Sequence, residues 1–516
     1  MNVSSPRATL QVTDNGSTIV INTGAGLIYT VNKSNGDITS CTFNGTELVG
    51  TKPSHINSGL GSSGTTVSWS TTDSDNTIIV SSETDTLTHY YVSRGGENNI
   101  YMATYITAEP SVGELRYIFR GNGSVLVNVP PYSDIRDNVG AVESSDVFAL
   151  ESGYTVSKYY GNDQAKDLAI RGATCSGVGV FMAYGCRESS SGGPFFRDIQ
   201  FQSGTNTEIY NYMNSGHNQT EDRRMGLNGP YALCFTSGAA PDVPALAWMS
   251  SLGLTGWVDD RGKVVLNGLS GMKSGYTYLI GFANETAQYW VSTTSTGSAV
   301  RDGIKPGTYT MTVYKNELAV YSEDVTVTAN SVTTVHTRTI NDPADTEVIW
   351  RIGVWDGTPL EFLNGGNLQY WHPSDQRNDS WVIESFAAGG DAGTFPAVQF
   401  RQINSTITIT FDLTEEQAAA AHTLNIGITG AYIGGRPDVS INGYSLTILS
   451  PSSQPSSRSF TIGTYRGNNA TFAWSIPASR FVTGSNTISF SPASGSSDLG
   501  GYLSAAYAFD CIELTA

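Results

Sequence analysis

The sequence predicts an all-β protein, from its composition and from the spacing of its apolar residues. Glycine is abundant (56 of 516 residues), charged residues make up only 14%, and Tyr, Val, Ile and Thr are plentiful. Short apolar runs recur between Asn-Gly, Gly-Gly and Ser-Gly turns, and no sustained helical period interrupts them in the first half of the chain. A chain of this length is too long for one hydrophobic core, so we expect several domains.

The first predicted domain, residues 1–250, is a long series of strands. Six segments have the composition and the turn-bounded length of strands: TIVINT (18–23), LIYTVN (27–32), TIIVSS (77–82), THYYVS (88–93), IYMATYITA (100–108) and ELRYIFR (114–120). The economical interpretation of this series is a large antiparallel β-sandwich.

Two further β domains are predicted after it. Residues 251–338 contain short strands at the spacing of a seven-stranded sandwich of the fibronectin type III kind. The polar segment TINDPADTE (339–347) contains a proline and is typical of a linker. It opens the third predicted domain, residues 339–516, which again consists of short strands.

Three local features complete the prediction. The only helical segment expected is TEEQAAAAHT (414–423), one or two turns long and N-capped by Thr414. The run SPSSQPSSRS (450–459) is predicted to be an exposed loop. Cys175 and Cys186 lie across a predicted hairpin and could pair, but their spacing alone does not decide it.

The charge balance excludes one class of partner and suggests a location. A formal charge of −18 provides no basic surface for nucleic acid, and no run of eighteen apolar residues predicts a membrane span. The N-terminus MNVSSPRATL lacks the apolar core of a signal peptide, and we interpret its methionine as replacing a removed one. Low charge with many Asn, Ser, Thr and Tyr residues is typical of secreted proteins that act on carbohydrate.

The strand ELRYIFR has two different faces. Alternation places Leu115, Tyr117 and Phe119 on the face of a core, and Arg116 and Arg120 together on the opposite face. Two arginines in register could bind an anion. The alternative is a solvated face with salt bridges to neighbouring strands.

A lysine and a histidine stand in unusual surroundings. Lys158 is followed by two tyrosines in SKYY, and His217 lies in the polar run YMNSGHNQTED after Tyr210 and Tyr212. The alternatives are a surface lysine and a loop histidine bonded to the backbone. Metal binding is not expected, because no second His or Cys stands at ligand spacing.

The candidate residues of this sequence do not favour a hydrolase. Glu114, Glu188 and Glu221 could serve as paired carboxylates, but none stands in a recognisable glycosidase pattern, and no G-x-S-x-G elbow is present. An inventory of Arg, Lys, Tyr and His suits β-elimination from a uronic acid instead. Arginines would stabilise the dianion that forms when the C5 proton leaves. A lysine crowded by arginines would favour its neutral form and accept that proton, a histidine would protonate the departing oxygen, and tyrosines would stack on sugars.

These residues stand in longer motifs that resemble the rhamnogalacturonan lyases of polysaccharide lyase family 4, of the fungal rhamnogalacturonase B type. The resemblance rests on segments spread over all three predicted domains: SHINSGLGS (54–62), THYYVS (88–93), YMATYITAEPSVGELRYIFR (101–120), SSGGPFFRDI (190–199), YMNSGHNQTEDRRMGLNGPY (212–231), KPGTYTMTVY (305–314) and GGRPDVSIN (434–442). It therefore covers essentially the whole chain.

The resemblance implies both a fold and an activity. It implies a mutarotase-like β-sandwich, a fibronectin type III-like domain and a jelly roll like a carbohydrate-binding module. It further implies β-elimination at the α-1,4 bond between rhamnose and galacturonic acid in rhamnogalacturonan I of pectin, which leaves a 4,5-unsaturated galacturonate. Six residues of this sequence match the family's functional residues: Lys158 as base, His217 as acid, and Arg116, Arg120, Tyr210 and Tyr212 as substrate-binding groups.

The resemblance also implies the partners. We expect no metal or other cofactor in the chemistry, although a structural calcium in the C-terminal domain, with unknown ligands, is compatible with the family. The expected partner is the pectin polysaccharide, with no nucleic acid or membrane, and the expected form is a secreted, extracellular monomer. Two other functions stay open at this point: a non-catalytic carbohydrate-binding protein and a mutarotase-like sugar epimerase.

Overall fold

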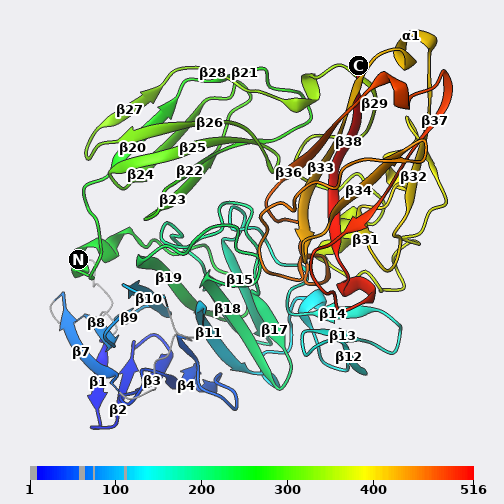
Figure 1. Cartoon of the computed structure of the whole chain (residues 1–516). Coiled ribbons are helices and arrows are strands. Elements are labelled where there is room, and N and C mark those ends of the chain that lie inside the picture. The colour runs from blue at the N-terminus through cyan, green and yellow to red at the C-terminus, as the bar shows by residue number, and fades with distance from the viewer. Residues whose placement is uncertain (1–8, 57–63, 74–75, 110–112) are drawn as a thin grey trace.

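A computed structural model of the chain describes residues 9–56, 64–73, 76–109 and 113–516. Its regular secondary structure consists mainly of strands, which confirms the predicted all-β class (Figure 1). The six strands predicted near the N-terminus are all present, with ends shifted by at most a few residues. Parts of the motifs at 54–62 and 101–120 lie outside the described residues.

Three large hydrophobic cores follow one another along the chain. Their buried residues span 10–235, 264–340 and 350–514. We call the regions around these cores the first, second and third domains; the boundaries at 250 and 338 stay predictions. In Figure 1 the second domain lies above the first, and the third lies beside both.

The described part of the first domain contains four sheets, whose strands follow in spatial order. The first comprises β1 (Gln11–Asp14), β2 (Thr18–Asn22), β3 (Leu27–Asn32), β4 (Ile38–Phe43) and β5 (Thr46–Glu47). The largest comprises β15 (Ile170–Cys175), β16 (Val178–Ala183), β19 (Gly226–Thr236), β10 (Asn99–Ile106), β9 (Leu87–Arg94), β8 (Thr77–Glu83) and β7 (Thr66–Thr72). The third comprises β17 (Phe201–Ser203), β18 (Asn206–Asn214), β11 (Leu115–Asn122) and β6 (His55–Ile56). A small fourth sheet comprises β12 (Gly140–Glu143), β13 (Val147–Ala149) and β14 (Thr155–Ser157).

The sheets of β10 and of β11 pack face to face, as a sandwich requires. Tyr117 of β11 is fully buried, and its ring lies 5.7 Å from that of His89 on β9 and 6.3 Å from that of Tyr231 on β19. Leu115 and Phe119 are also fully buried in this core. The predicted core face of ELRYIFR is therefore correct, and its other face points away from the sandwich.

That outer face of β11 and β18 is covered in part by the small sheet and by the third domain. Ile118 belongs to a second cluster of buried residues, with Tyr159 directly after β14 and Ile462 of the third domain. The small sheet is itself bonded to the third domain: the Thr155 hydroxyl donates to the Asp375 carboxylate, 2.7 Å away. Segments of the first and third domains thus meet over one face of the sheet that contains β11 and β18.

The second domain is a β-sandwich of short sheets. One sheet contains β24 (Ala299–Ile304), β20 (Gly262–Leu266) and β27 (Val332–Val335), next to the pair β21 (Leu269–Ser270) and β28 (Arg338–Thr339). The other contains β23 (Gln288–Ser292), β22 (Tyr278–Ala283), β25 (Gly307–Lys315) and β26 (Leu318–Val327). At the end of β25, Lys315 Nζ lies 2.5 Å from Asp342 Oδ2, and both side chains are fully buried. This ion pair ties the second domain to the segment that leads into the third.

The third domain packs two sheets on a core rich in aromatic side chains. One contains β29 (Val348–Gly353), β38 (Ala506–Thr515), β33 (His422–Tyr432) and β36 (Ala470–Ile476), with β31 (Val398–Phe400) also on β38. The other contains β30 (Phe386–Ala387), β32 (Ile407–Leu413), β37 (Gly484–Ala493), β34 (Arg436–Ile441) and β35 (Tyr444–Ser445). The predicted helix is a single turn, α1 (Glu415–Ala418), with Thr414 at its N-cap and Gln417 completing a capping box.

Two further predictions can be compared with the structure. All five cysteines are free, so Cys175 and Cys186 do not pair. Within the described residues, no helix is long and apolar enough to cross a membrane.

Candidate active site

The outer face of β11 and β18 forms the floor of the candidate site. In the antiparallel pairing Arg116 lies opposite Tyr212 and Ile118 lies opposite Tyr210, so all four side chains share this face. The rings of Tyr210 and Tyr212 stack, with their centroids 5.9 Å apart. Burial raises the pKa of both hydroxyls well above the ordinary value, so both remain neutral hydrogen-bonding groups.

His217 lies at the edge of this floor, just after β18 ends. Its backbone N–H donates to the Ser215 hydroxyl, 2.9 Å away, which holds the turn that follows the strand. Its ring lies 5.4 Å from that of Tyr159 and 5.6 Å from that of Tyr212, and 26% of the side chain is exposed. The predicted loop histidine is thus packed against aromatic rings and remains accessible to a ligand.

Two carboxylates flank the His217 ring. Nδ1 lies 3.0 Å from Asp198 Oδ1, and Nε2 lies 3.3 Å from Glu114 Oε1. Burial lowers the pKa of His217, but the charge and hydrogen bond of Asp198, together with the charge of Glu114, outweigh it and raise the pKa above 6.5. These carboxylates therefore shift the ring toward the imidazolium form, in which both ring nitrogens carry protons.

Arg116 joins the same network from the floor. Its guanidinium donates to the Tyr212 hydroxyl and lies 3.0 Å from Glu114 Oε2. Burial lowers the pKa of Arg116, but Tyr212 and Glu114 raise it further, so the group stays charged. Glu114 is thus a carboxylate shared by Arg116 and His217, which shows that this pair of cations can bind a carboxylate group.

Arg120 lies on the same face, four residues after Arg116 along β11. Its Nε lies 3.0 Å from Glu208 Oε1, the residue opposite it on β18. His55, which pairs with Ile118 from the other side, has its pKa lowered to about 4 by burial and then by the charges of Arg120 and Arg116. The structure therefore places Arg116 in the network of His217 and gives Arg120 an internal partner.

Lys158 reaches the site from the small sheet. Because Val147 of β13 pairs with Ser157 of β14, the next residues outward, Asp146 and Lys158, lie across from each other. Lys158 Nζ lies 2.6 Å from Asp146 Oδ1. The lysine is also close enough to His217 to lower the histidine's pKa by repulsion. The nearest charged partner of Lys158 is therefore a carboxylate rather than the two arginines predicted from the sequence.

The third domain contributes Arg458 to this region. One guanidinium nitrogen lies 2.9 Å from Asp146 Oδ2, and another lies 2.6 Å from Glu143 Oε1. Burial raises the pKa of Asp146, but Lys158 and Arg458 lower it by more, so the carboxylate stays charged. The run 450–459, predicted to be an exposed loop, is thus partly buried where Arg458 holds the small sheet.

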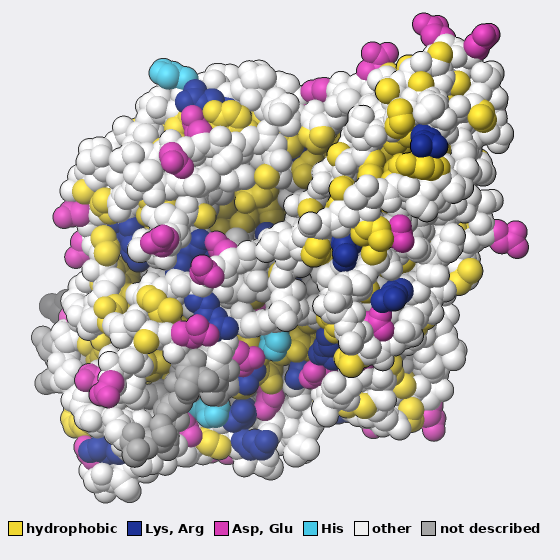
Figure 2. All heavy atoms as spheres, viewed as in Figure 1, with side chains coloured by type: hydrophobic (Ala, Val, Ile, Leu, Met, Phe, Trp, Pro, Cys, Tyr) yellow, Lys and Arg dark blue, Asp and Glu magenta, His cyan; other side chains and the backbone are white. Residues whose placement is uncertain are grey.

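The structure brings five of the six predicted residues to one place. Arg116, Tyr210 and Tyr212 form its floor, His217 its edge, and Lys158 approaches from the small sheet. Figure 2 shows a hollow here, in which a histidine lies among basic and acidic side chains between the first and third domains. A hollow with aromatic walls and paired basic and acidic groups can bind a sugar and move protons at it.

Three residues of the network escaped prediction from sequence. Asp198 lies inside the motif SSGGPFFRDI, but its contact with His217 depends on the fold of the intervening loop. Asp146 faces Lys158 only through the pairing of β13 and β14. Arg458 comes from more than three hundred residues away along the chain, and no local pattern connects it to the small sheet.

The carboxylates considered for hydrolysis have other roles. Glu188 Oε2 lies 2.6 Å from Arg261 of the second domain, and Glu221 Oε2 lies 2.7 Å from Arg224. Only Glu114 of the three lies at His217. Among the described residues, no group of three or more His, Cys, Asp or Glu side chains is placed to hold a metal ion.

Family profiles match nearly the whole chain. The profile for "Rhamnogalacturonan lyase B, N-terminal" matches residues 10–256. The profiles for domains II and III of polysaccharide lyase family 4 match residues 261–335 and 348–514.

Curated relatives align with the chain from end to end. Rhamnogalacturonate lyase A of Emericella nidulans is 43% identical over 516 residues, which covers 98% of this chain and 96% of the relative. The protein of the same name from Aspergillus aculeatus is 42% identical, with the same coverage of both chains. A putative rhamnogalacturonase of Neurospora crassa is 39% identical and covers 99% of this chain and 96% of its own.

Proposed function

The chain belongs to polysaccharide lyase family 4 and is a rhamnogalacturonan lyase, and on this premise we propose how its side chains divide the reaction. The proposed roles are those of a base (Lys158), an acid (His217), carboxylate-binding groups (Arg116 and Arg120) and sugar-binding groups (Tyr210 and Tyr212). The observation that carries the proposal is the position of His217, which shares Glu114 with Arg116 and lies within electrostatic reach of Lys158.

The reaction has a defined balance of bonds. Lys158 takes the proton from C5 of the galacturonate, and the electron pair left behind forms the double bond between C4 and C5. The bond between C4 and the glycosidic oxygen breaks, and that oxygen leaves with the rhamnose and takes a proton from His217. No oxidant or water is consumed, and the product is a 4,5-unsaturated galacturonate at the new non-reducing end.

His217 is suited to the role of acid because its surroundings favour the protonated ring. Asp198 and Glu114 raise its pKa and so stabilise the form that carries a proton on Nε2. Asp198 bonds the other nitrogen and fixes the orientation of the ring. General acid catalysis of this kind accelerates a reaction by roughly 10²- to 10⁴-fold.

Lys158 can accept a proton only as the neutral amine. The charged groups around it therefore matter for the reaction. Asp146 favours the ammonium form, but this carboxylate is shared with Arg458. Because the Asp146 carboxylate interacts with both cations, it attracts each of them less strongly than it would attract a single partner. We propose that Lys158 attacks C5 as the neutral amine, after its ammonium proton has passed to solvent.

Arg116 is the proposed main ligand of the uronate carboxylate. Its resting partner Glu114 is itself a carboxylate, so the guanidinium is already oriented toward such a group. Positive charge at this point stabilises the dianion that develops as C5 loses its proton. Arg120, held by Glu208, adds positive charge further along the same face.

The test follows the ultraviolet band of the unsaturated uronate with rhamnogalacturonan I as substrate. Lys158→Ala and His217→Ala are each expected to lower kcat by roughly 10²- to 10⁴-fold while KM changes little, since each removes a proton-transfer group. Lys263→Ala and His336→Ala, at exposed sites of the second domain, serve as matched controls. Near-normal turnover of Lys158→Ala at every pH would refute its role as base, and new reducing ends without the band would indicate hydrolysis.

We also propose that the elimination requires no bound metal, because Arg116 and His217 supply the positive charge. A structural calcium ion in the third domain, which the family resemblance allows, stays a proposal. No ligands for it can be named among the described residues. Treatment with EDTA is expected to leave kcat unchanged. A fall in Tm alone would indicate a structural ion, whereas a fall in kcat reversed by calcium would contradict the proposal.

The protein is further proposed to act outside the cell as a monomer. Its pectic substrate is a cell-wall polymer, and a net charge of −18 opposes the association of like copies. Light scattering after size exclusion is expected to give the mass of one chain, 55.0 kDa. Activity recovered from the culture medium rather than from washed cells would support secretion.

A further inference from the structure

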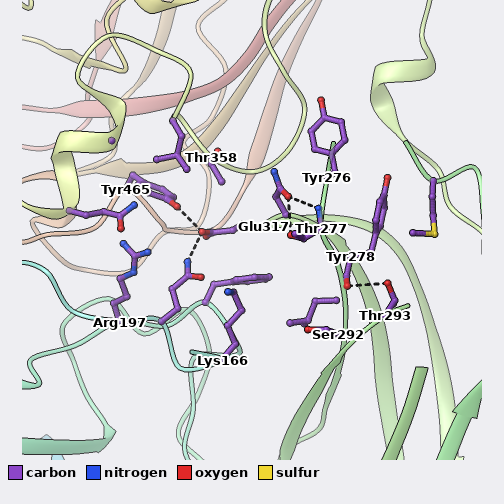
Figure 3. Close-up of a pocket in the computed structure, with 18 of the residues that line it drawn as sticks. Lys166, Arg197, Tyr276, Thr277, Tyr278, Ser292, Thr293, Glu317, Thr358 and Tyr465 are labelled. Carbon is purple, nitrogen blue, oxygen red and sulfur yellow. Dashed lines mark hydrogen bonds between the residues drawn. The ribbon is translucent and has the colours of Figure 1, made fainter. Parts of the chain in front are cut away.

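A large cavity lies apart from the candidate active site, where all three domains meet. It measures about 820 Å³, and we call it the junction pocket. Its wall includes Lys166 and Arg197 of the first domain, Tyr276 and Glu317 of the second, and Tyr370 and Tyr465 of the third (Figure 3). A volume of this order accommodates a short oligosaccharide.

The junction pocket is distinct from the site of His217. None of the six residues assigned to the reaction lines it. Arg197 and Asp198 are consecutive, yet Arg197 lines the pocket while Asp198 bonds His217. The two sites therefore lie on opposite sides of one segment of the first domain.

Arg197 is a cation without an anion. Its Nε is buried and has no hydrogen-bond partner among the described residues, and no described carboxylate forms an ion pair with it. Its guanidinium carbon lies 5.8 Å from the centre of the Tyr465 ring, which leaves its charge uncompensated. An unpaired, partly buried guanidinium favours an external carboxylate, which can accept two of its hydrogen bonds.

Glu317 supplies the complementary feature. Its Oε1 accepts hydrogen bonds from Gln164 at 2.6 Å and from the Tyr465 hydroxyl at 2.7 Å. Its Oε2 is buried without a hydrogen-bond partner among the described residues, and the nearest cation, Arg466, lies 3.9 Å away. The Glu317 carboxylate, which lines the pocket, therefore has the capacity to accept a further hydrogen bond from a hydroxyl donor. Arg197 and Glu317 together favour a ligand that carries a negative charge and several hydroxyl groups.

The remaining walls suit a sugar. Lys166, whose ion-pair partner among the described residues is its exposed neighbour Asp167, adds a second positive charge to the wall. Tyr370 is 38% exposed, and Tyr276, labelled in Figure 3, contributes a further ring to the lining. Aromatic faces pack against the C–H groups of sugar rings. Hydrophobic side chains gather between the second and third domains in the view of Figure 2.

We propose that the junction pocket is a second binding site for galacturonate-containing oligosaccharides, with the uronate carboxylate on Arg197 and Lys166 and sugar hydroxyls on Glu317. The identity of the ligand rests on the pectic substrate of the enzyme, but the site does not depend on the roles proposed for Lys158 and His217. A polymer bound there as well as at the active site would remain attached to the enzyme after cleavage.

The test uses a ligand that the enzyme cannot cleave: the disaccharide with galacturonate at its non-reducing end and rhamnose at its reducing end. It lacks the α-1,4 bond from rhamnose to galacturonic acid that the enzyme cleaves, so its binding is independent of any catalytic role. Calorimetric titration of the full-length protein is expected to give two sites per chain. Arg197→Ala should weaken one site by about tenfold or more and leave the other, whereas Arg116→Ala should affect only the other.

Two controls make the result decisive. Arg401→Ala, which removes a half-exposed arginine of the third domain, should leave both sites intact. The disaccharide with its carboxyl group reduced to an alcohol should lose the site that depends on Arg197. A single site that Arg116→Ala abolishes and Arg197→Ala leaves unchanged would overturn the proposal, and so would equal binding of the reduced disaccharide at the junction pocket.

Discussion

At the scale of single residues, the state of His217 is set by what lies on either side of its ring. Asp198 bonds Nδ1 and Glu114 lies at Nε2, and together they raise the pKa above 6.5 against the effect of burial. Activity that requires the protonated ring is therefore present below the raised pKa and is lost as pH rises through it. The alkaline limb of the pH–rate profile should report this group.

Asp198→Asn is predicted to move that limb to lower pH by roughly one unit, because the mutation removes a negative charge that favours the imidazolium. The measurement is kcat/KM against pH with rhamnogalacturonan I. Asp163→Asn, which changes a more exposed carboxylate paired with Arg171, is the matched control and should leave the profile in place. An alkaline limb that stays at the same pH in Asp198→Asn would exclude His217 as the group that titrates there.

At the scale of elements, the small sheet of β12, β13 and β14 positions the proposed base. The register of β13 and β14 sets Asp146 across from Lys158, and Arg458 of the third domain bonds both Asp146 and Glu143. His372, also of the third domain, lies 3.2 Å from Glu143 through its Nε2. A sheet of three short strands is marginal alone, so these contacts fix where Lys158 lies.

Arg458→Ala is predicted to lower kcat by roughly 10²-fold, because the small sheet loses the charge that holds Asp146 and Glu143 and Lys158 is displaced from its position. Arg458→Lys should recover part of the activity. Arg480→Ala, in the same domain and stacked on Tyr444, is the control. Thermal unfolding of each variant separates displacement from unfolding, and wild-type kcat in Arg458→Ala would contradict the positioning role.

Sequence reasoning succeeded where the pattern is local. Alternation predicted the two faces of ELRYIFR, and the composition around α1 predicted a short helix with Thr414 as its cap. It failed for contacts that depend on how distant segments pack. The Ser- and Pro-rich composition around Arg458 is that of an exposed loop, and only the docking of the third domain brings this residue to Glu143. Asp146 was likewise not predicted as the partner of Lys158, because the register of β13 and β14 was not predicted.

At the scale of the whole molecule, the domains are joined by buried polar contacts. The ion pair of Lys315 and Asp342 is the most buried of them, with both side chains fully shielded from solvent. Lys315 Nζ also lies 4.8 Å from the centre of the Tyr276 ring, and Asp342 Oδ1 accepts the backbone N–H of Ala344. This pair therefore sets how the chain leaves the second domain.

Lys315→Met is predicted to cost about 3–5 kcal/mol of stability, because it leaves the Asp342 carboxylate buried without its counter-charge. The double variant Lys315→Met/Asp342→Leu should recover much of the loss. Urea unfolding followed by tyrosine and tryptophan fluorescence measures both, and Lys263→Met, at a partly exposed pair with Asp302, is the control. Equal stability of Lys315→Met and the control would show that the pair contributes little.

The contacts of the Glu317 carboxylate have a consequence for how the enzyme folds during its synthesis on the ribosome. Its Oε1 is bonded by Gln164 of the first domain, made early, and by Tyr465 of the third, made near the end. Arg458, which holds the small sheet, is synthesised only seven positions before Tyr465. Nascent chains that already contain both Lys158 and His217 thus lack the contacts that position them. Catalytic competence is expected to arise late and abruptly, as the last strands of the chain emerge.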